Sequence, residues 1–214
     1  MYNRKDHYYK KAKEEGFASR ATYKFEQIET KYKVVKKGDH VLDLGCAPGG
    51  WLQILSRLVG PKGLVAGIDI LPIKIQLPEN VRFILGDIND DVAMGKVLEF
   101  FDPSAVSPSG HRIIDLVVSD MAPNTSGVAF KDCYLSYELC VSALDVAKKV
   151  LKEGGNFVTK IFQGQELNKF RLELKKNFEK VESYIPPATR QASKEQYLIG
   201  KGYLCHCSEQ EVPS

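Results

Sequence analysis

A short apolar stretch at residues 40–44 runs into a loop of glycine, alanine and proline, and a second apolar stretch with helical spacing follows. This order predicts a buried strand, a tight loop and a helix. Gly45, Gly49 and Gly50 lack the Cβ atoms that would hold a ligand away from the backbone, and the loop ends at a helix N-terminus. We therefore expect a nucleotide-like ligand here, although an ordinary turn would look the same on this loop alone.

Two further apolar runs end in acidic residues. Residues 63–68 lead to Asp69, 24 positions after Gly45, which is close to the spacing at which an acid meets ribose hydroxyls in doubly wound nucleotide sites. Residues 81–85 lead to Asp87. Because open α/β sheets bind ligands beyond the carboxyl ends of their strands, these residues predict a site at one edge of an α/β sheet.

The loop also indicates which nucleotide is expected. It reads G-x-A-P-G-G, so it has neither the G-x-G-x-x-G pattern of dinucleotide sites nor the G-K-[ST] ending that grips terminal phosphates. A pyrophosphate cradle is therefore disfavoured. The stretch resembles the S-adenosylmethionine site of class I methyltransferases.

Length and composition place the chain among single-domain proteins of a reducing compartment. Its 214 residues suffice for one buried α/β core, and no apolar run approaches 18 residues, so we expect a cytoplasmic protein with no membrane partner. Five cysteines without a CxxC pair argue against a disulfide framework. The cluster Cys205-His206-Cys207 lacks a second ligand pair, and we interpret it as strand-end residues rather than as a metal site.

Positive charge is concentrated at the start of the chain. Residues 1–37 contain eleven lysines and arginines against five acidic residues, interleaved with aromatic residues. Gly16 and Ser19 divide this segment into two predicted helices, with Ser19 as the N-cap of the second. The rings could simply pack on the sheet while the charges face solvent, but basic and aromatic residues together also suit RNA. We expect a basic arm at residues 1–37 with rings inward and charges toward RNA, and a catalytic domain at residues 38–214.

Periodicity defines the remaining elements. Further helices are predicted at residues 91–101, at 135–151 with Gly154-Gly155 closing the helix, and at 166–177. Strands are predicted at residues 113–119, 156–162, 181–185 and 195–204. The Pro- and Ser-rich loop at 102–110 is interpreted as a spacer without function.

Four charged residues are candidates to align an acceptor hydroxyl with an activated methyl group, which is most of what such a transfer requires. Asp120 directly follows a predicted strand, and Lys160 stands inside another one. Glu195 begins the last strand, and Lys24 lies on the second helix of the arm. Taken singly, Lys24 and Glu195 read as ordinary surface charges.

The chain resembles the FtsJ/RrmJ family of ribosomal RNA ribose 2′-O-methyltransferases. The resemblance rests on seven blocks in the same order, at residues 19–24, 45–51, 69–72, 86–87, 119–127, 160–164 and 190–197. It implies a Rossmann-like class I methyltransferase fold, with a seven-stranded, mostly parallel sheet and helices on both faces. The family's Lys-Asp-Lys-Glu tetrad falls on Lys24, Asp120, Lys160 and Glu195.

The same resemblance implies the cofactor contacts. Gly49, Trp51, Asp69 and Asp87 would contact S-adenosylmethionine together with Gly45 and Pro48 of the loop, and Asp120 would border both cofactor and acceptor. The family assigns the proton acceptor to Lys160. Neighbouring carboxylates would keep Lys160 charged, whereas burial and Lys24 would favour its neutral form. Lys160 could therefore orient the 2′-oxygen instead, with water taking the proton.

The substrate expectation is more open than the chemistry. The segments 121–127 and 162–164 look like the ribosomal branch. This resemblance implies a monomeric enzyme that methylates a uridine of large-subunit ribosomal RNA, with the RNA inside the large subunit. The basic segment 10–16 also looks like enzymes that modify the transfer RNA anticodon loop. A nicotinamide-dependent dehydrogenase is disfavoured by the missing glycine pattern, and a non-catalytic RNA-binding assembly factor is disfavoured by the complete tetrad.

Overall fold

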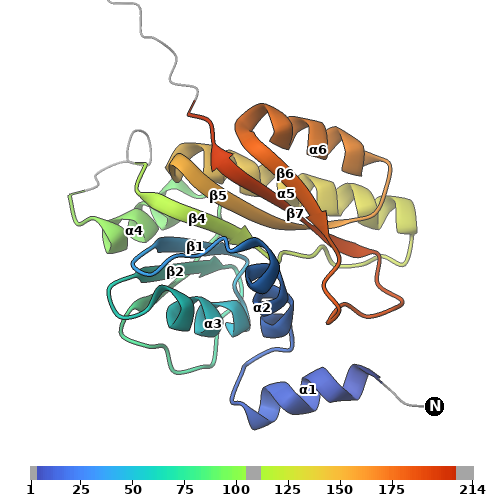
Figure 1. Ribbon diagram of the computed structural model, residues 1–214, viewed down its shortest axis with the longest axis horizontal. Coiled ribbons are helices and arrows are strands. Elements are labelled where there is room, and N and C mark those ends of the chain that lie inside the picture. The colour runs from blue at the N-terminus through green and yellow to red at the C-terminus, as the bar shows by residue number, and fades with distance from the viewer. Residues whose placement is uncertain (1–3, 105–111, 206–214) are drawn as a thin grey trace, which may run out of the picture.

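Seven strands form a single sheet in the order β3-β2-β1-β4-β5-β7-β6 (Figure 1). The computed structural model describes residues 4–104 and 112–205. The strands are β1 (His40–Leu44), β2 (Leu64–Asp69), β3 (Val81–Leu85), β4 (Ile114–Ser119), β5 (Leu151–Phe162), β6 (Phe178–Tyr184) and β7 (Glu195–Tyr203).

Strands β1 to β5 run parallel, and β7 is antiparallel to both of its neighbours, β5 and β6. The chain builds outward from β1 to β3, then returns to place β4 on the other side of β1. The carboxyl ends of β1 and β4 therefore flank the point where the strand order reverses, which is where open α/β sheets bind ligands. The loops that carry Gly45 and Asp120 begin at this point.

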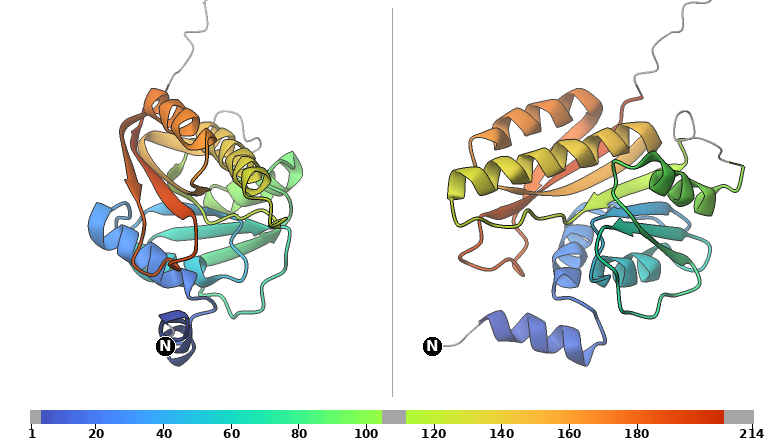
Figure 2. Two further views of the ribbon diagram at one scale, coloured as in Figure 1. Left: turned by 90° about the vertical axis from the view of Figure 1, so that its right-hand side faces the viewer. Right: turned by 180° about the vertical axis from the view of Figure 1, so that it is seen from behind.

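Helices cover both faces of the sheet (Figure 2). They are α1 (Arg4–Glu14), α2 (Ala21–Tyr32), α3 (Gly50–Val59), α4 (Asp91–Phe101), α5 (Ala129–Val150) and α6 (Glu166–Asn177). The apolar sides of α4, α5 and α6 pack in one core cluster, and those of α2 and α3 pack in a second cluster on the opposite face. The predicted class of fold is confirmed.

Helix α2 belongs to the core even though it lies in the basic first segment. Phe25 and Ile28 are fully buried in the cluster that also contains Trp51 of α3. Helix α1 packs on α2 through a small cluster around Ala12 and Tyr23. The two helices of this segment thus differ in their contacts. Helix α2 packs against the sheet and α3, whereas α1 packs against α2.

Helix α5 begins at Ala129, six residues before the predicted start at residue 135. Its first turn contains Lys131 and Asp132 and leaves Phe130 exposed, so no apolar periodicity marks it. The carboxylate of Asp132 accepts hydrogen bonds from the N–H and hydroxyl groups of Ser126, at 2.7 and 2.8 Å. These bonds hold the incoming loop against the helix start and satisfy backbone donors there.

The prediction that Gly154-Gly155 closes helix α5 is wrong. The helix ends at Val150, and β5 begins at the next residue, Leu151. Gly154 has a φ of 75°, and the β4–β5 register shifts between Ile114 and Leu116. A Cβ on Gly155 would lie 2.9 Å from the Lys152 carbonyl oxygen. The glycines therefore accommodate an irregularity inside the sheet, Gly154 through its positive φ and Gly155 because a side chain would not fit.

Three smaller expectations need correction or fall outside the described residues. The N-cap position of α2 is Arg20 rather than Ser19, although the Ser19 hydroxyl accepts the N–H of Ala21 at 3.0 Å. Strand β6 starts at Phe178, three residues before the predicted start, because α6 passes directly into it. Most of the loop at 102–110, and His206 and Cys207 of the terminal cluster, lie outside the described residues.

Membrane-spanning character is absent from the described helices. Within residues 4–104 and 112–205, none is both long enough and apolar enough to cross a bilayer.

Candidate active site

The loop after β1 is held closely against the end of β2. The N–H of Gly45 donates to the Ile68 carbonyl at 2.9 Å, and the N–H of Ala47 donates to one carboxylate oxygen of Asp69 at 2.8 Å. The other oxygen of Asp69 accepts the N–H of Leu71 at 2.8 Å. Asp69 thus fixes the loop and the chain that leaves β2, which are two walls of the site.

Glycine is required in this loop for close approach as well as for backbone conformation. Gly45 has a φ of 74° and Gly49 a φ of 104°. A Cβ on Gly45 would collide with Met121, and one on Gly49 would collide with Ile75. Backbone strain therefore disfavours side chains at both positions, and at Gly45 the contact with Met121 also leaves no space.

A cavity of about 500 Å³ lies beyond the ends of β1, β2, β3 and β4. Four of the predicted cofactor residues line it: Gly45, Asp69, Asp87 and Asp120. Further lining comes mainly from the residues that follow each strand, namely Ala47, Ile70, Leu71, Gly86, Ile88, Asn89, Met121, Ala122 and Asn124. The site therefore combines apolar surface with carboxylates, as a nucleoside with a sugar diol would require.

Pro48 and Trp51 line a narrower space of about 60 Å³ next to this cavity, and Gly49 lines neither. The indole of Trp51 is buried, donates to the Ala21 carbonyl at 2.8 Å and lies 5.0 Å from the ring of Phe25. Trp51 thus borders the site while acting as a core residue that joins α2 to α3.

Asp43 is the group in this region that most clearly lacks a partner. It lies on β1, is 1% exposed and lines the narrow space, and neither of its carboxyl oxygens has a hydrogen-bond partner among the described residues. Burial, and then the charges of Asp120 and Asp69, raise its pKa well above the ordinary value. A buried acid without a partner is costly in the free protein, and a cationic ligand would compensate it.

S-adenosylmethionine fits this set of residues. Its sulfonium and ammonium groups would meet the carboxyl groups of Asp43 and Asp120, and its nucleoside would occupy the larger cavity beside Asp69 and Asp87. The glycine contacts leave backbone, rather than side chains, facing the ligand.

Lys160 and Asp120 form a closely bound pair at the end of β4 and β5. The Lys160 Nζ donates to the Asp120 backbone carbonyl at 2.6 Å and lies 3.0 Å from its carboxylate. The same carboxylate accepts the hydroxyl of Tyr197 at 2.7 Å. The β5–β7 register places Tyr197 directly opposite Lys160, which explains how both reach Asp120.

Asp120 is ionised at neutral pH. Burial would raise its pKa, but the charges of Lys160 and Lys24 and the hydrogen bonds from Tyr197 and Lys160 outweigh burial and lower it. Burial and the charges of Asp120 and Glu195 raise the pKa of Tyr197 well above its ordinary value, so its hydroxyl is a neutral donor. A carboxylate held in this way accepts protons poorly and positions its neighbours firmly.

Lys24 and Glu195 form a second buried pair. Their Nζ and Oε1 atoms are 2.5 Å apart, and both side chains are largely buried. Because the charge of Lys24 also lowers the pKa of Asp120, the two pairs lie within electrostatic reach of each other. The structure therefore brings together four residues that are distant in the sequence.

Three neighbouring cavities share lining residues, and we call the largest of them, the one beyond the strand ends, the cofactor cavity. The narrow space shares Gly45, Ala47 and Asp120 with the cofactor cavity, and it shares Ser19 and Ala21 with a third cavity of about 480 Å³. Lys24 and Glu195 line this third cavity. We call the narrow space the neck and the third cavity the basic cavity. Asp120 lines both the cofactor cavity and the neck, so it would lie beside the point where a ligand in the cofactor cavity met a ligand entering from the basic cavity.

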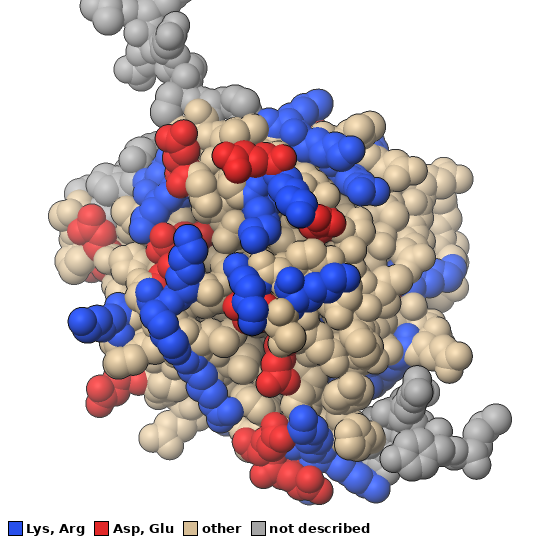
Figure 3. Space-filling model, viewed as in Figure 1, with Lys and Arg blue, Asp and Glu red and all other residues tan. Residues whose placement is uncertain are grey.

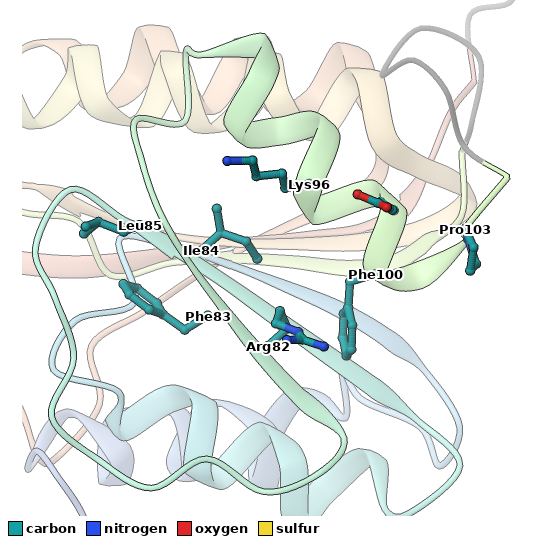
Figure 4. Close-up of a pocket in the computed structure, with 8 residues that line it drawn as sticks. Arg82, Phe83, Ile84, Leu85, Lys96, Phe100 and Pro103 are labelled. Carbon is teal, nitrogen blue, oxygen red and sulfur yellow. The ribbon is translucent and has the colours of Figure 1, made fainter.

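Another cavity, of about 610 Å³, lies at the far edge of the sheet between β3 and α4 (Figure 4). Figure 4 shows Arg82, Phe83 and Phe100 among the side chains that surround it. None of the predicted site residues lines it. Its size alone does not connect it with the chemistry.

Sequence reasoning missed Asp43 and Tyr197. Alternation along β7 puts Tyr197 on the same face as Glu195, two residues earlier, and this period of two was the signal available for it. Asp43 stood as a charge inside an apolar strand, which is the same signal that identified Lys160. A tyrosine in a strand is typical of a core residue, and the glycines after Asp43 were the stronger sign of a ligand site, so neither residue was predicted.

Comparison with known proteins decides the family. The sequence profile of the FtsJ-like methyltransferases matches residues 17–203. The chain belongs to this family. The predicted family is thereby confirmed. The fold and family of this FtsJ-like methyltransferase also agree with the predicted cofactor, S-adenosylmethionine.

Relatives cover almost the whole chain. A protein of Bdellovibrio bacteriovorus named ribosomal RNA large subunit methyltransferase E is 44% identical over 199 residues, which are 93% of this chain and 97% of the relative. The protein of that name from Methanosarcina mazei is 45% identical and aligns with 94% of this chain and 71% of the relative.

Solved structures agree with the fold. A structure described as a ribosomal RNA methyltransferase from Plasmodium falciparum has a TM-score of 0.74 and 29% identity, covering 88% of this chain and 99% of that one. Fibrillarin from Aeropyrum pernix, solved with natively bound S-adenosyl-L-methionine, has a TM-score of 0.56 and 16% identity, covering 86% and 74%. At that identity, the likeness to fibrillarin concerns the fold alone.

Proposed function

We propose that this FtsJ-like methyltransferase transfers a methyl group from S-adenosylmethionine to the ribose 2′-hydroxyl of a uridine in large-subunit ribosomal RNA. The observation that carries the proposal is the position of the Lys160–Asp120 and Lys24–Glu195 pairs, around a neck between the cofactor cavity and a more basic cavity. The names of the relatives from Bdellovibrio and Methanosarcina support ribosomal RNA as the substrate.

In this proposal, the loop after β1 and the carboxylates of Asp69 and Asp87 would hold the cofactor. When bound, S-adenosylmethionine supplies a methyl group activated by its sulfonium, and the electron pair of the broken carbon–sulfur bond stays on sulfur. The ribose enters from the basic cavity, so that its 2′-oxygen reaches the neck beside Asp120. Holding the two reacting groups in line accounts for a large part of the rate.

Lys160 holds the acceptor oxygen. An ammonium group has three N–H bonds, and two of them are directed at the carbonyl and the carboxylate of Asp120. The third is available to the 2′-oxygen, where it stabilises the negative charge that develops as the hydroxyl proton is lost to water. Asp120 and Tyr197 keep Lys160 in place, and the Lys24–Glu195 pair closes the other side of the acceptor position.

We infer that residues 1–37 contact the RNA. Lys10 and Lys13 of α1 are exposed, whereas Tyr8 and Phe17 pack against Tyr23, with ring centroids 5.4 and 6.0 Å apart. Lys11 lies over the ring of Tyr23 at 4.7 Å. In this arrangement the lysine side chains face solvent and the aromatic rings pack beneath them, as a phosphate-contacting arm requires. We further propose that the enzyme acts as a cytoplasmic monomer.

The test is transfer of a radiolabelled methyl group from S-adenosylmethionine to large ribosomal subunits from cells that lack this enzyme. Free ribosomal RNA, transfer RNA and capped RNA serve as competitors, and the labelled nucleotide is mapped. We expect one labelled uridine ribose in large-subunit RNA. Label in the transfer RNA anticodon loop would replace the ribosomal assignment. Cofactor binding without label in any RNA would favour an assembly factor.

A further inference from the structure

The basic cavity is lined by more positive charge than the proposed chemistry uses. Arg20 and Arg190 line it together with Lys24 and Glu195. Lys24 and Glu195 neutralise each other as an ion pair at 2.5 Å, so the two guanidinium groups leave the lining with an excess of two positive charges. Figure 3 shows Lys and Arg side chains spread across the middle of one face of the molecule, with acidic side chains among them.

Arg20 is held in place by the opposite wall of the cavity. Its Nη2 atom donates to the backbone carbonyl of Ala188 at 3.1 Å. The N–H of Ala188 in turn donates to the side chain of Gln27 on α2 at 2.9 Å. Arg20 and Gln27 therefore both bond the backbone of Ala188, in the segment before β7, and the first of these bonds preorganises the guanidinium.

Arg190 has no such partner. It is exposed, and it makes no ion pair or side-chain hydrogen bond with any residue in the described part of the chain. Burial, and then the charge of Arg190, lower the pKa of Arg20. Two guanidinium groups facing one cavity repel each other, and an anion between them would remove this repulsion.

The cavity also offers hydroxyl donors. The Oγ atoms of Ser19 and Ser193 accept the N–H groups of Ala21 and Glu195, at 3.0 and 3.3 Å. Because each hydroxyl acts as an acceptor in these bonds, its proton stays available to a ligand. The volume of about 480 Å³ is within the range of about 300–1,000 Å³ that is typical of ligand sites.

We propose that the basic cavity binds one backbone phosphate of the RNA, next to the nucleotide that is methylated, through the guanidinium groups of Arg20 and Arg190. Guanidinium groups match phosphate oxygens geometrically, and phosphate contacts fix the register of a nucleic acid on a protein. The phosphate site would set which ribose reaches the neck, since Ser19 and Ala21 line both spaces. The inference rests on the proposed function, because it names a contact of that same substrate.

The decisive variant is Arg190→Gln, because Arg20 also holds the backbone at Ala188 and its loss would confound folding with binding. Arg171→Gln is the matched control: Arg171 is an exposed arginine on α6 that does not line the basic cavity. Arg190→Lys retains the charge but not the two-pronged geometry. Each protein is assayed for methyl transfer to large subunits over a range of salt concentrations.

For Arg190→Gln at 0.1 M salt we expect KM for the RNA substrate to rise about tenfold, with kcat within about twofold of wild type. The slope of log KM against log salt should fall by about 0.7–0.9, the value for one lost phosphate contact. Arg190→Lys should lie between wild type and Arg190→Gln, and Arg171→Gln should match wild type. Cofactor affinity should not change in any variant.

Two outcomes overturn the phosphate site. If Arg190→Gln behaves like Arg171→Gln in KM and salt slope, Arg190 does not bind a phosphate. If kcat falls while KM is unchanged, Arg190 acts on the reaction instead. Inorganic phosphate, added at constant ionic strength, distinguishes a free anion: tight inhibition that disappears in Arg190→Gln would replace the RNA assignment.

Failure of the proposed function gives a different result. If wild-type protein methylates no RNA, the phosphate site is still tested by the fluorescence anisotropy of a labelled, unstructured 20-nucleotide RNA. Weaker binding and a lower salt slope for Arg190→Gln than for Arg171→Gln would then support the site without the activity. Equal binding by the two variants would overturn it.

Discussion

Asp120 connects the two halves of the site at the level of a single residue. Its carbonyl and carboxylate both accept from Lys160, its carboxylate accepts from Tyr197, and it lines both the cofactor cavity and the neck. Because Asp120 is already ionised and fully engaged, the group left to act on an acceptor is Lys160. The first prediction therefore concerns Lys160.

Lys160→Ala should abolish methyl transfer while leaving the affinity for S-adenosylmethionine within about threefold of wild type, because Lys160 does not line the cofactor cavity. Isothermal titration and a single-turnover transfer assay measure the two quantities. Lys62→Ala, an exposed lysine before β2, is the control and should retain both. Near-normal turnover in Lys160→Ala would remove this residue from the mechanism, and loss of both properties would make its role structural.

Asp43 supplies a prediction on pH. In the free protein its raised pKa means that the carboxyl holds its proton to higher pH than an ordinary aspartate. A cationic cofactor favours the ionised form and lowers that pKa, so binding releases a proton and affinity rises with pH until the free carboxyl has titrated.

Asp43→Asn should remove this pH dependence and weaken cofactor binding at alkaline pH by about tenfold. Affinity for S-adenosylmethionine measured from about pH 5.5 to 8.5 provides the check, since this range lies above the ordinary aspartate pKa of about 3.9. Asp39→Asn is the matched control, because burial also raises the pKa of Asp39 but it lines neither the cofactor cavity nor the neck. A wild-type affinity that is flat with pH would contradict the role of Asp43.

A charge inside an apolar strand is a signal that the sequence offers at both Lys160 and Asp43, although only Lys160 was predicted from it. Lys160 stands in a strand of Phe, Val and Ile, so its presence required a reason. Tyr197 satisfies the apolar pattern of β7, and only its distance to Asp120 reveals its part. Arg190 lies in a connection without periodicity, so its position opposite Arg20 follows from the tertiary fold alone.

At the scale of elements, α2 and α3 are joined so that Lys24 is fixed relative to the loop after β1. The indole of Trp51 donates to the Ala21 carbonyl at 2.8 Å, and the Thr22 hydroxyl donates to the Gly50 carbonyl at 3.0 Å. Lys24 is less than one turn further along α2. The position of this side chain therefore depends on contacts at the start of both helices.

Trp51→Phe should lower the free energy of unfolding by about 2 kcal/mol, because the Ala21 carbonyl loses its donor and the smaller ring leaves space in the core. It should also lower kcat several-fold, since α2 carries Lys24. Urea unfolding and single-turnover transfer measure these effects. Tyr32→Phe, which removes an exposed hydroxyl 3.4 Å from the Ser183 carbonyl, should stay within about 0.5 kcal/mol of wild type. Equal stability of the two variants would contradict this account of the α2–α3 junction.

Elements with clear periodicity were predictable, and their irregular ends were not. The predicted strands at residues 40–44 and 81–85 coincide with β1 and β3, because each is apolar and bounded by turn residues. The start of α5 was not predicted because local hydrogen bonds between Ser126 and Asp132, not apolar spacing, define it. Gly154-Gly155 could equally end a helix or accommodate an irregular strand, and the pairing of β5 with β4 decides for the strand.

At the scale of the whole molecule, the cofactor cavity draws on β1, β2, β3 and β4 together. Its lining residues come mainly from the ends of these strands and the segments after them, with Leu139 and Ser142 added by α5. A ligand bound here contacts parts of the chain that come together only in the folded protein. Binding therefore stabilises the native state and not the unfolded chain.

S-adenosylmethionine at about 100 times its Kd should add about 2.7 kcal/mol to the free energy of unfolding and raise Tm by about 5–10 °C. NAD at the same concentration should leave Tm unchanged, because the loop lacks a pyrophosphate cradle. Differential scanning calorimetry with either ligand decides between them. A larger shift with NAD would restore the dehydrogenase alternative.

The neck, of about 60 Å³, shares lining residues with each of the two larger cavities, and those two share none with each other. We therefore expect the spent donor and the modified nucleotide to leave by separate routes. Initial-rate patterns should show random rather than compulsory order of addition. A fresh donor can be loaded while the polynucleotide is still docked, so turnover on a large, slowly diffusing particle does not have to wait for that particle to depart.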